Sequence, residues 1–261
     1  MITALNNKGV KRIIALKKSS KDRKKEGTFI VEGTRMFDET PDELIKSVYV
    51  TPDYQEKCGI EEKKRLERLN PVTVSGEVFS KMSDTITPQG ILVEVTFPKN
   101  NVRDIIHNDN AFLLCLQDIQ DPGNLGTMLR TAEGAGITGI IMSRGCVDIY
   151  SPKVVRSTMG AIFRMPFAYT EDLEDTVECM KQLDISVYAA ALHNNSVPYT
   201  DRLYDGKCAI LIGNEGNGLT REIIGRASKS VVIPMSGQLE SLNAAISAGI
   251  IMYEARRQRE Q

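Results

Sequence analysis

A series of uninterrupted apolar runs in the second half of the chain constrains the fold most. Such runs are expected for strands that are covered on both faces, which is the situation of strands in a parallel sheet. Helical stretches fall between several of them, notably at 171–183 and 219–227. This alternation predicts an α/β domain with a mainly parallel sheet. The runs are AFLLCL (111–116), GIIM (139–142), ISVYAAAL (185–192), CAILIG (208–213) and SVVIP (230–234).

The first part of the chain has shorter and more mixed elements, which predict a smaller α+β domain at residues 1–95. A polar, Asn-rich stretch at 96–110 is interpreted as a linker to the α/β domain at 111–261. The elements predicted in the first domain are strands at TFIVEG (28–33), SVYVTP (47–52) and GILVEV (90–95), and a helix at EEKKRLERL (61–69).

Charge is distributed unevenly along the chain. The whole sequence has 33 Lys and Arg against 34 Asp and Glu, for a net charge of -1. Residues 1–26, in contrast, carry nine basic residues against two acidic ones. Such a segment is either a solvated helix face or a contact surface for phosphate backbones, and the asymmetry shifts the balance toward nucleic acid. The basic residues are Lys8, Lys11, Arg12, Lys17, Lys18, Lys21, Arg23, Lys24 and Lys25.

Composition argues against several other classes of protein. No apolar run approaches the ~20 residues that a membrane span needs, and the start MITALNNKGVKR lacks the apolar core of a signal peptide. The five cysteines form no C-x-x-C pair, and their odd number does not suit a disulfide framework. We therefore expect a cytoplasmic protein. Only two histidines are present, His107 and His193, which argues against a zinc cluster or a His-based triad.

Ligands of parallel α/β sheets bind at the carboxyl ends of the strands, and three polar segments follow predicted strands there. The first is QDIQDPGNLGTMLRTAEGAG (117–136). Asn124 stands where a helix should begin, and Arg130 lies six residues further on. Arg130 shares a helix face with Gly126 at four-residue spacing. Taken alone, this segment is also explained as a capped helix with a surface arginine.

The second segment, LIGNEGNGL (211–219), contains three glycines after an apolar strand. Their spacing, G-x-x-G-x-G from Gly213, is not the dinucleotide fingerprint, and no acidic residue follows about twenty positions later to hold a ribose. Glu215 within the loop would repel a pyrophosphate. We expect a loop that approaches a ligand closely with its backbone, the ligand not being polyanionic. A plain glycine turn is the simpler alternative.

The third segment is VIPMSGQLESLNAAISAG (232–249), in which a helix is predicted to begin near Ser241 and to cover about 239–258. Ser241 and Asn243 lie at the predicted helix start, where side-chain oxygens meet free backbone N–H groups. Helix capping alone would explain either residue. It explains less well why three Gly-, Ser- and Asn-rich loops follow three core-type strands.

Taken together, the three segments resemble the three sequence motifs of the SpoU (TrmH) family of SPOUT RNA 2′-O-ribose methyltransferases. NLGTMLRTA is similar to the first motif, LIGNEGNGL to the second, and VIPM with SLNAAISAG to the third. Residues 1–95 resemble the N-terminal substrate-binding domain of that family. The resemblance implies a SPOUT-type sheet with a C-terminal trefoil knot, S-adenosyl-L-methionine as methyl donor, RNA as substrate, and a homodimer with shared active sites.

The resemblance also implies roles for individual residues. Arg130 would act on the ribose 2′-hydroxyl, either as a literal general base or as a cation that stabilises the developing alkoxide. Because the pKa of arginine lies above about 12, the second role is the easier one to arrange. No metal is required. Asn124, Glu215, Ser241 and Asn243 would orient Arg130 and the substrate, and the cofactor would be held at Leu192, Gly213, Ile233, Met235 and Leu242.

The expected function is therefore 2′-O-ribose methylation of a structured RNA. A separate N-terminal domain implies a large substrate, which favours 23S rRNA over transfer RNA. The alternatives are a tRNA ribose methyltransferase, an rRNA methyltransferase that confers antibiotic resistance, and a catalytically silent RNA-binding or ribosome-assembly protein. A silent protein is disfavoured because Arg130 and Asn243 are both present. A nicotinamide-dependent enzyme is disfavoured by the glycine spacing.

Overall fold

The computed structural model describes residues 1–193, 195–239 and 241–260. It separates into two compact units. The N-terminal unit comprises Met1–Pro98 and Asp148–Phe163, and the C-terminal unit comprises Lys99–Val147 and Arg164–Gln261. Glu240 and Gln261, which fall within the predicted last helix and the predicted second domain, lie outside the described residues.

The N-terminal unit contains a four-stranded sheet in the order β1-β4-β2-β3. β4 is antiparallel to both β1 and β2, whereas β3 runs parallel to β2. The three predicted strands and the predicted helix α5 are confirmed. The strands are β1 (Thr28–Glu32), β2 (Ile45–Val50), β3 (Val72–Thr73) and β4 (Ile91–Thr96). The helices are α1 (Lys8–Lys18), α2 (Ser20–Glu26), α3 (Thr34–Glu39), α4 (Pro52–Lys57), α5 (Ile60–Leu69), α6 (Gly76–Met82), α9 (Pro152–Thr158) and α10 (Ala161–Arg164). Helix α10 ends at the boundary between the two units.

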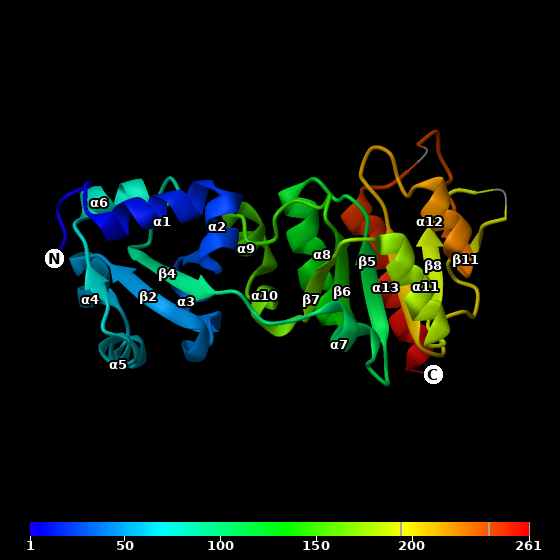
Figure 1. The fold of residues 1–261 in the computed structure, drawn as a ribbon, viewed down its shortest axis with the longest axis horizontal. Helices are drawn as coiled ribbons and strands as arrows, with labels where there is room; N and C mark the ends of the chain where they lie inside the picture. The colour runs from blue at the N-terminus through cyan, green and yellow to red at the C-terminus, as the bar shows by residue number, and fades with distance from the viewer. Residues whose placement is uncertain (194, 240, 261) are drawn as a thin grey trace. The chain divides into compact units, whose positions relative to one another are not determined.

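Helix α1 illustrates how the basic segment folds. The side chain of Asn7 caps it by accepting from the backbone N–H groups of Gly9 and Val10. Val10, Ile13 and Leu16 lie on one side of the helix and are buried with residues of α6 and of the sheet. The apolar spacing explains why α1 lies along one face of the sheet, as Figure 1 shows for α1 and α6.

A buried carboxylate anchors α1 to the sheet. Glu94, in the middle of β4, is fully buried, and its two oxygens accept from the Arg12 guanidinium at 2.6 and 2.5 Å. Thr28 Oγ1 and Ser47 Oγ donate to the same carboxylate at 3.0 and 2.9 Å, and Lys46 Nζ lies 3.1 Å away. Burial alone would raise the pKa of Glu94, but the hydrogen bonds from Arg12, Ser47 and Lys46 outweigh it, and the pKa lies below its ordinary value.

The C-terminal unit contains the predicted parallel sheet, with seven strands in the order β7-β6-β5-β10-β8-β11-β9. All the strand pairs in this sheet are parallel, so the predicted α/β class with a mainly parallel sheet is confirmed. The short edge strands β7 and β9 were not predicted. The strands are β5 (Phe112–Leu116), β6 (Gly139–Ser143), β7 (Phe167–Thr170), β8 (Ser186–Ala190), β9 (Val197–Pro198), β10 (Cys208–Ile212) and β11 (Lys229–Val232).

Helices cover both faces of this sheet. α7 (Val102–Ile106), α11 (Leu173–Gln182) and α12 (Arg221–Arg226) contribute to one hydrophobic core with alternate residues of the central strands. α8 (Pro122–Ala135) and α13 (Ala244–Arg259) pack against each other, and α13 contacts β10. This layering explains why the central strands read as continuous apolar runs.

Residues 148–163 were predicted in the second domain but belong to the N-terminal unit. Two further details differ from the sequence predictions. The stretch expected to be a linker contains α7, which Asn101 caps and whose Ile105 and Ile106 are buried against the sheet. The last helix begins at Ala244 instead of near residue 239, because Asn243 is its N-cap and accepts from the N–H groups of Ala245 and Ile246. None of the described helices is long and apolar enough to cross a membrane.

Replacing Glu94 tests its role as the anchor of α1. We expect Glu94→Gln to lower the free energy of unfolding by about 3 kcal/mol, because it leaves the Arg12 guanidinium facing a neutral amide in a buried site. Glu26→Gln is the matched control, since Glu26 also lies near Arg12, at 3.8 Å, but is exposed. We expect the control to change stability by less than about 0.5 kcal/mol. Urea denaturation measures both, and equal effects would contradict the prediction.

Candidate active site

Three loops follow strands at the carboxyl edge of the parallel sheet. They are the segments after β5, after β10 and after β11, which are the three polar segments identified in the sequence. β5 and β10 are neighbours in the sheet, and β8 separates β10 from β11. Because parallel strands end on the same side, the sheet brings the three loops together although they lie far apart in sequence.

The loop after β10 closes on itself. The backbone N–H of Asn214 donates to the carbonyl of Gly218 at 3.1 Å, and the N–H of Gly218 donates back to the carbonyl of Asn214 at 2.9 Å. Gly218 has a φ of 68°, in the left-handed region that favours glycine. A Cβ atom on Gly213 would lie 2.2 Å from the carbonyl carbon of Gly218 and 2.3 Å from the backbone nitrogen of Leu219. Glycine is therefore required at 213 by the loop's own closure, whereas the sequence had suggested the approach of a ligand.

A chain of side-chain hydrogen bonds joins the three loops. Glu215 accepts from the backbone N–H groups of Gln120 and Asp121 and from Asn124 Nδ2, each at 3.0 Å. Asn124 Oδ1 in turn accepts from Asn243 Nδ2 at 3.0 Å. Asn243 completes the chain as the N-cap of α13, so one residue from each motif takes part.

Glu215 is the charged member of this chain. Partial burial alone would raise its pKa, but the hydrogen bonds from Asn124, Gln120 and Asp121 outweigh burial and hold the pKa below its ordinary value. The ionised carboxylate therefore contributes its full stabilisation of the loops when the pH lies above the ordinary pKa of glutamate. This stabilisation is lost as the pH falls through the lowered pKa of Glu215. At neutral pH the carboxylate is ionised, which makes its hydrogen bonds the stronger, charge-assisted kind.

A pocket of about 380 Å³ lies beside this network. Its volume falls within the range of about 300–1,000 Å³ that is typical of small-molecule sites. The described residues that line it include no lysine, arginine or histidine, and Glu215 is the single charged side chain among them. The predicted cofactor residues that line it are Leu192, Gly213, Ile233, Met235 and Leu242.

The predicted catalytic residues are arranged in two groups. Glu215 and Ser241 line the pocket, while Asn124 and Asn243 tie the loops together next to it. Arg130 lies on α8 with an exposed side chain. Within the described residues its guanidinium makes no hydrogen bond or ion pair, and thus none with the four residues that were expected to orient it.

Three residues that the sequence reasoning did not single out also shape the loops. Asn214 Nδ2 donates to the carbonyl of Asp118 at 2.8 Å, and Asp118 has a φ of 54°, which is uncommon for a residue other than glycine. Gln117 Oε1 accepts from the backbone N–H of Thr220 at 2.9 Å. The sequence feature that could have identified them is the series of amide and carboxylate side chains immediately after β5. In the described parts of the chain no group of three His, Cys, Asp or Glu residues could hold a metal ion.

Two of the three glycines of the second loop provide a test of its geometry. We expect Gly213→Ala to distort the loop and to weaken ligand binding in the pocket at least tenfold, because its Cβ would collide with backbone atoms that cannot move away cheaply. Gly216→Ala is the matched control, since its Cβ would lie 3.6 Å from Asn214 Oδ1, an ordinary contact. Calorimetry with S-adenosylmethionine and chemical denaturation measure the two effects. Equal affinities for the two variants would contradict the steric argument.

Comparison with known proteins agrees with this geometry. The model of the SpoU rRNA Methylase family matches residues 111–253, and that of the MRM3-like substrate binding domain matches residues 7–93. The chain is 30% identical over 240 residues to the 23S rRNA (guanosine(2553)-2′-O)-methyltransferase RlmP of Bacillus subtilis, covering 91% of this chain and 92% of that protein. It is 28% identical over 307 residues to the human mitochondrial rRNA methyltransferase 3, covering 94% of this chain and 71% of that protein.

Solved structures show the same likeness. An S-adenosylmethionine-bound rRNA methyltransferase from Sinorhizobium meliloti superposes with a TM-score of 0.85 at 32% identity, covering 98% of this chain and 97% of that one. The cofactor complex of the SpoU methyltransferase AviRb from Streptomyces viridochromogenes also gives a TM-score of 0.85, at 25% identity, and covers 98% of this chain and 99% of that one. With three motif loops joined at one sheet edge and a family match over more than half its length, the chain belongs to the SpoU rRNA methylase family.

Proposed function

We propose that the protein transfers the methyl group of S-adenosylmethionine to a ribose 2′-oxygen of ribosomal RNA. The observation that carries the proposal is the pocket at the carboxyl edge of the sheet, whose walls come largely from the second and third motif segments. Asn124 of the first segment is hydrogen-bonded to Glu215 in the pocket wall and to Asn243. Two relatives whose names give rRNA as substrate align with over 90% of the chain. The cofactor-bound neighbours support the same donor.

The pocket has the chemistry that this donor requires. Leu192, Ile233, Met235 and Leu242 offer apolar contacts, and the backbone of the 213–218 loop offers N–H and carbonyl groups. The donor carries a positive sulfonium, so a pocket with Glu215 and without a cationic side chain among its described lining suits it. When bound, the cofactor supplies an electrophilic methyl group. Residues 213, 233 and 242 would hold it and fix its orientation toward the acceptor.

Arg130 would assist the acceptor. The ribose hydroxyl loses a proton as it is methylated, and a fixed cation nearby lowers the energy of the developing alkoxide. Arg130 is exposed and has no partner within the described residues, so its guanidinium is available to an RNA phosphate and ribose. Because the pKa of arginine lies above about 12, we assign it this electrostatic role and not that of a base.

Asn124, Glu215 and Asn243 would act as positioning residues. Their side chains are hydrogen-bonded to one another and to the backbone of residues 120, 121, 245 and 246. They would therefore hold the loops in a shape that accepts the cofactor. Ser241, at the pocket wall, is assigned to the same task on the substrate side.

A homodimer is part of the proposal. Ile246 and Tyr253 on α13 are 53% and 49% exposed, and the half-buried Ile250 lies between them. Their spacing of four and three residues places them on one face of the helix. A second copy of the chain is the partner proposed for this stripe, and it would bring Arg130 of one protomer to the cofactor pocket of the other.

The N-terminal unit is proposed to bind the RNA backbone, in a cytoplasmic protein. Of the nine basic residues in segment 1–26, three are used internally: Arg12 on Glu94, Arg23 on Asp148, and Lys17 on backbone carbonyls. The other six are exposed and make no ion pair or side-chain hydrogen bond within the described residues. We call this set the lysine face; it consists of Lys8, Lys11, Lys18, Lys21, Lys24 and Lys25.

Methyl transfer from tritiated S-adenosylmethionine to 23S rRNA tests the function. We expect incorporation without added metal, a 2′-O-methylated nucleotide on mapping, and cofactor binding of roughly micromolar affinity. Arg130→Ala should lower kcat by about 10²–10³-fold, as removal of an oxyanion-stabilising donor does, while cofactor affinity stays unchanged. Arg103→Ala, an exposed arginine on α7, is the control and should keep full activity. Absence of cofactor binding, with and without RNA, would refute the function.

Subunit mixing tests the shared site. An Arg130→Ala chain and a Gly213→Ala chain should each be nearly inactive alone. After exchange, half of the dimers are mixed and each holds one intact composite site, so we expect about a quarter of the wild-type activity. No recovery in a stable dimer would place Arg130 and the cofactor in the same protomer. A monomer in sedimentation at micromolar concentration would contradict the dimer itself.

A further inference from the structure

The loop between α6 and β4, residues 83–90, carries an isoleucine without any packing partner. Ile86 is fully exposed, at 101% of its reference area. Single exposed apolar residues are common on protein surfaces and need no special account. The setting of Ile86 is unusual because the loop that presents it is fixed at both ends.

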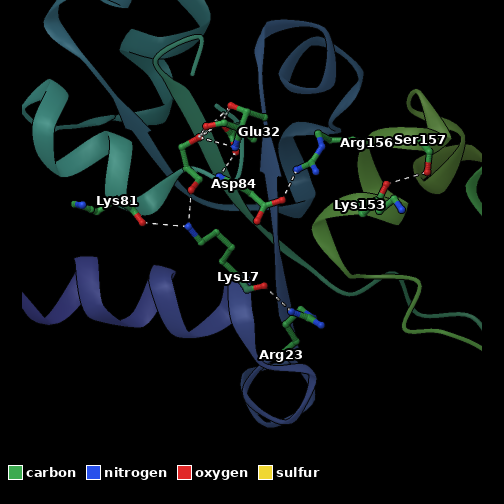
Figure 2. Close-up of polar contacts among 10 residues, drawn as sticks. Lys17, Arg23, Glu32, Lys81, Asp84, Lys153, Arg156 and Ser157 are labelled. Atoms are coloured by element: carbon green, nitrogen blue, oxygen red, sulfur yellow. Dashed lines mark hydrogen bonds and ion pairs between the residues drawn. The ribbon is translucent and has the colours of Figure 1, made fainter. Parts of the chain in front are cut away.

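The carboxylate of Glu32, at the end of β1, supports the first half of the loop. It accepts from Ser83 Oγ, from the backbone N–H of Asp84 at 2.9 Å and from Thr85 Oγ1 at 2.7 Å. Figure 2 shows Glu32 above Asp84, with these contacts as dashed lines. The Glu32 carboxylate thus accepts hydrogen bonds from all three residues that immediately precede Ile86.

Basic side chains add to this support. Lys17 Nζ donates to the carbonyls of Lys81 and Ser83, and Arg156 Nη1 donates to Asp84 Oδ2 at 2.8 Å (Figure 2). Lys17 belongs to α1, so the helix that carries part of the lysine face is bonded directly to the base of the loop.

The second half of the loop is held by polar contacts to other elements. Gln89 Oε1 accepts from the backbone N–H of Thr34 at 2.8 Å, and the N–H of Thr51 donates to the carbonyl of Gly90 at 2.9 Å. Gly90 has a φ of 90°, and a Cβ there would lie 2.5 Å from Thr51 Oγ1. Between these two anchored ends, residues 86–88 make no hydrogen bond within the described residues. The loop therefore holds its apolar tip away from the body of the unit.

We propose that Ile86 contacts an unpaired base of the substrate RNA, while the lysine face on α1 and α2 contacts the phosphates on either side. This inference rests on the proposed function, because it takes RNA as the substrate. Phosphate contacts position a protein without reading sequence, and contacts with bases supply selectivity. RNA is read mainly where its bases are unstacked, and apolar side chains can pack against such bases.

The charge of helices α1 and α2, in the same unit, favours RNA over a protein partner as the occupant. On α1, Lys8, Lys11 and Lys18 lie on the side opposite to the buried residues. On α2, Lys21 and Lys25 lie opposite to the buried Arg23, and Lys24 is also exposed. None of these six lysines forms an ion pair within the described residues. Such a surface attracts a polyanion, and its binding strength falls steeply with salt.

The test compares two RNA probes and two matched isoleucines in the full-length protein. The probes are deproteinised 23S rRNA and a fully paired RNA duplex, and binding to intact ribosomal subunits is measured beside them. The variants are Ile86→Ala and Ile60→Ala, since Ile60 on α5 is also highly exposed, at 76%, in the same unit. We expect Ile86→Ala to raise Kd and KM for 23S rRNA about tenfold, with kcat, duplex affinity, cofactor affinity and the salt dependence unchanged. Ile60→Ala should leave all of these at their wild-type values.

A lysine variant tests the contribution of the lysine face separately from that of Ile86. Lys11→Gln with Lys18→Gln should weaken binding to both RNAs. It should also reduce the slope of log K against log salt by about 0.9 for each duplex phosphate that the variant no longer neutralises. An unchanged slope would overturn the assignment of the lysine face.

Three outcomes would overturn the role of Ile86. The first is wild-type RNA binding by Ile86→Ala, and the second is an equal loss of affinity for both RNAs. The third is a loss of affinity for intact ribosomal subunits but not for deproteinised rRNA, which would identify a protein as the partner. Failure of the proposed function can be told apart from failure of this inference. If only the proposed function failed, the wild-type protein would bind 23S rRNA selectively through Ile86 without methylating it.

Discussion

The hydrogen-bond chain from Glu215 through Asn124 to Asn243 is the interaction on which the candidate site depends. Loops at a sheet edge expose backbone N–H groups that need acceptors, and a single ionised carboxylate provides one for Gln120 and Asp121 together. Through Asn124 the same carboxylate reaches the cap of α13. The loop after β5 is thereby hydrogen-bonded to both of the other loops, and it links the Glu215 side of the pocket wall to the start of α13.

Much of the fold could be predicted from the sequence because the physical signal was local. Continuous apolar runs predicted the central strands of the parallel sheet, and the Asn243 cap follows from its position before a run of alanines. The pairing of Asn124 with Glu215 could not be predicted in this way. It depends on β5 and β10 being neighbours in the sheet, and their paired residues lie about ninety positions apart along the chain.

The departures from prediction arise from two kinds of contact, the closure of a loop on itself and the packing of residues that lie far apart in the sequence. Gly213 looked like a residue reserved for a ligand, but its missing Cβ makes room for the backbone of Gly218 and Leu219. The polar stretch before β5 looked like a linker, yet Ile105 and Ile106 find a buried place against the sheet. Residues 148–163 read as part of the α/β domain, and they pack with the N-terminal unit through Tyr150, whose ring stacks on Phe97 with centroids 3.8 Å apart.

Three glutamates explain how a chain with a net charge of -1 can present a strongly basic surface. Glu94 accepts hydrogen bonds from several separate segments, whereas Glu32 and Glu215 each accept hydrogen bonds from a single loop segment. These three negative charges are therefore paired with groups of the protein itself. Other acids pair with neighbouring cations on the surface, as Asp53 does with Lys57 and Asp42 with Arg65. The lysine face on α1 and α2 forms no such pairs among the described residues. Its charge is therefore left to solvent or to a polyanion, and the overall balance of acidic and basic residues conceals a surface that the fold itself creates.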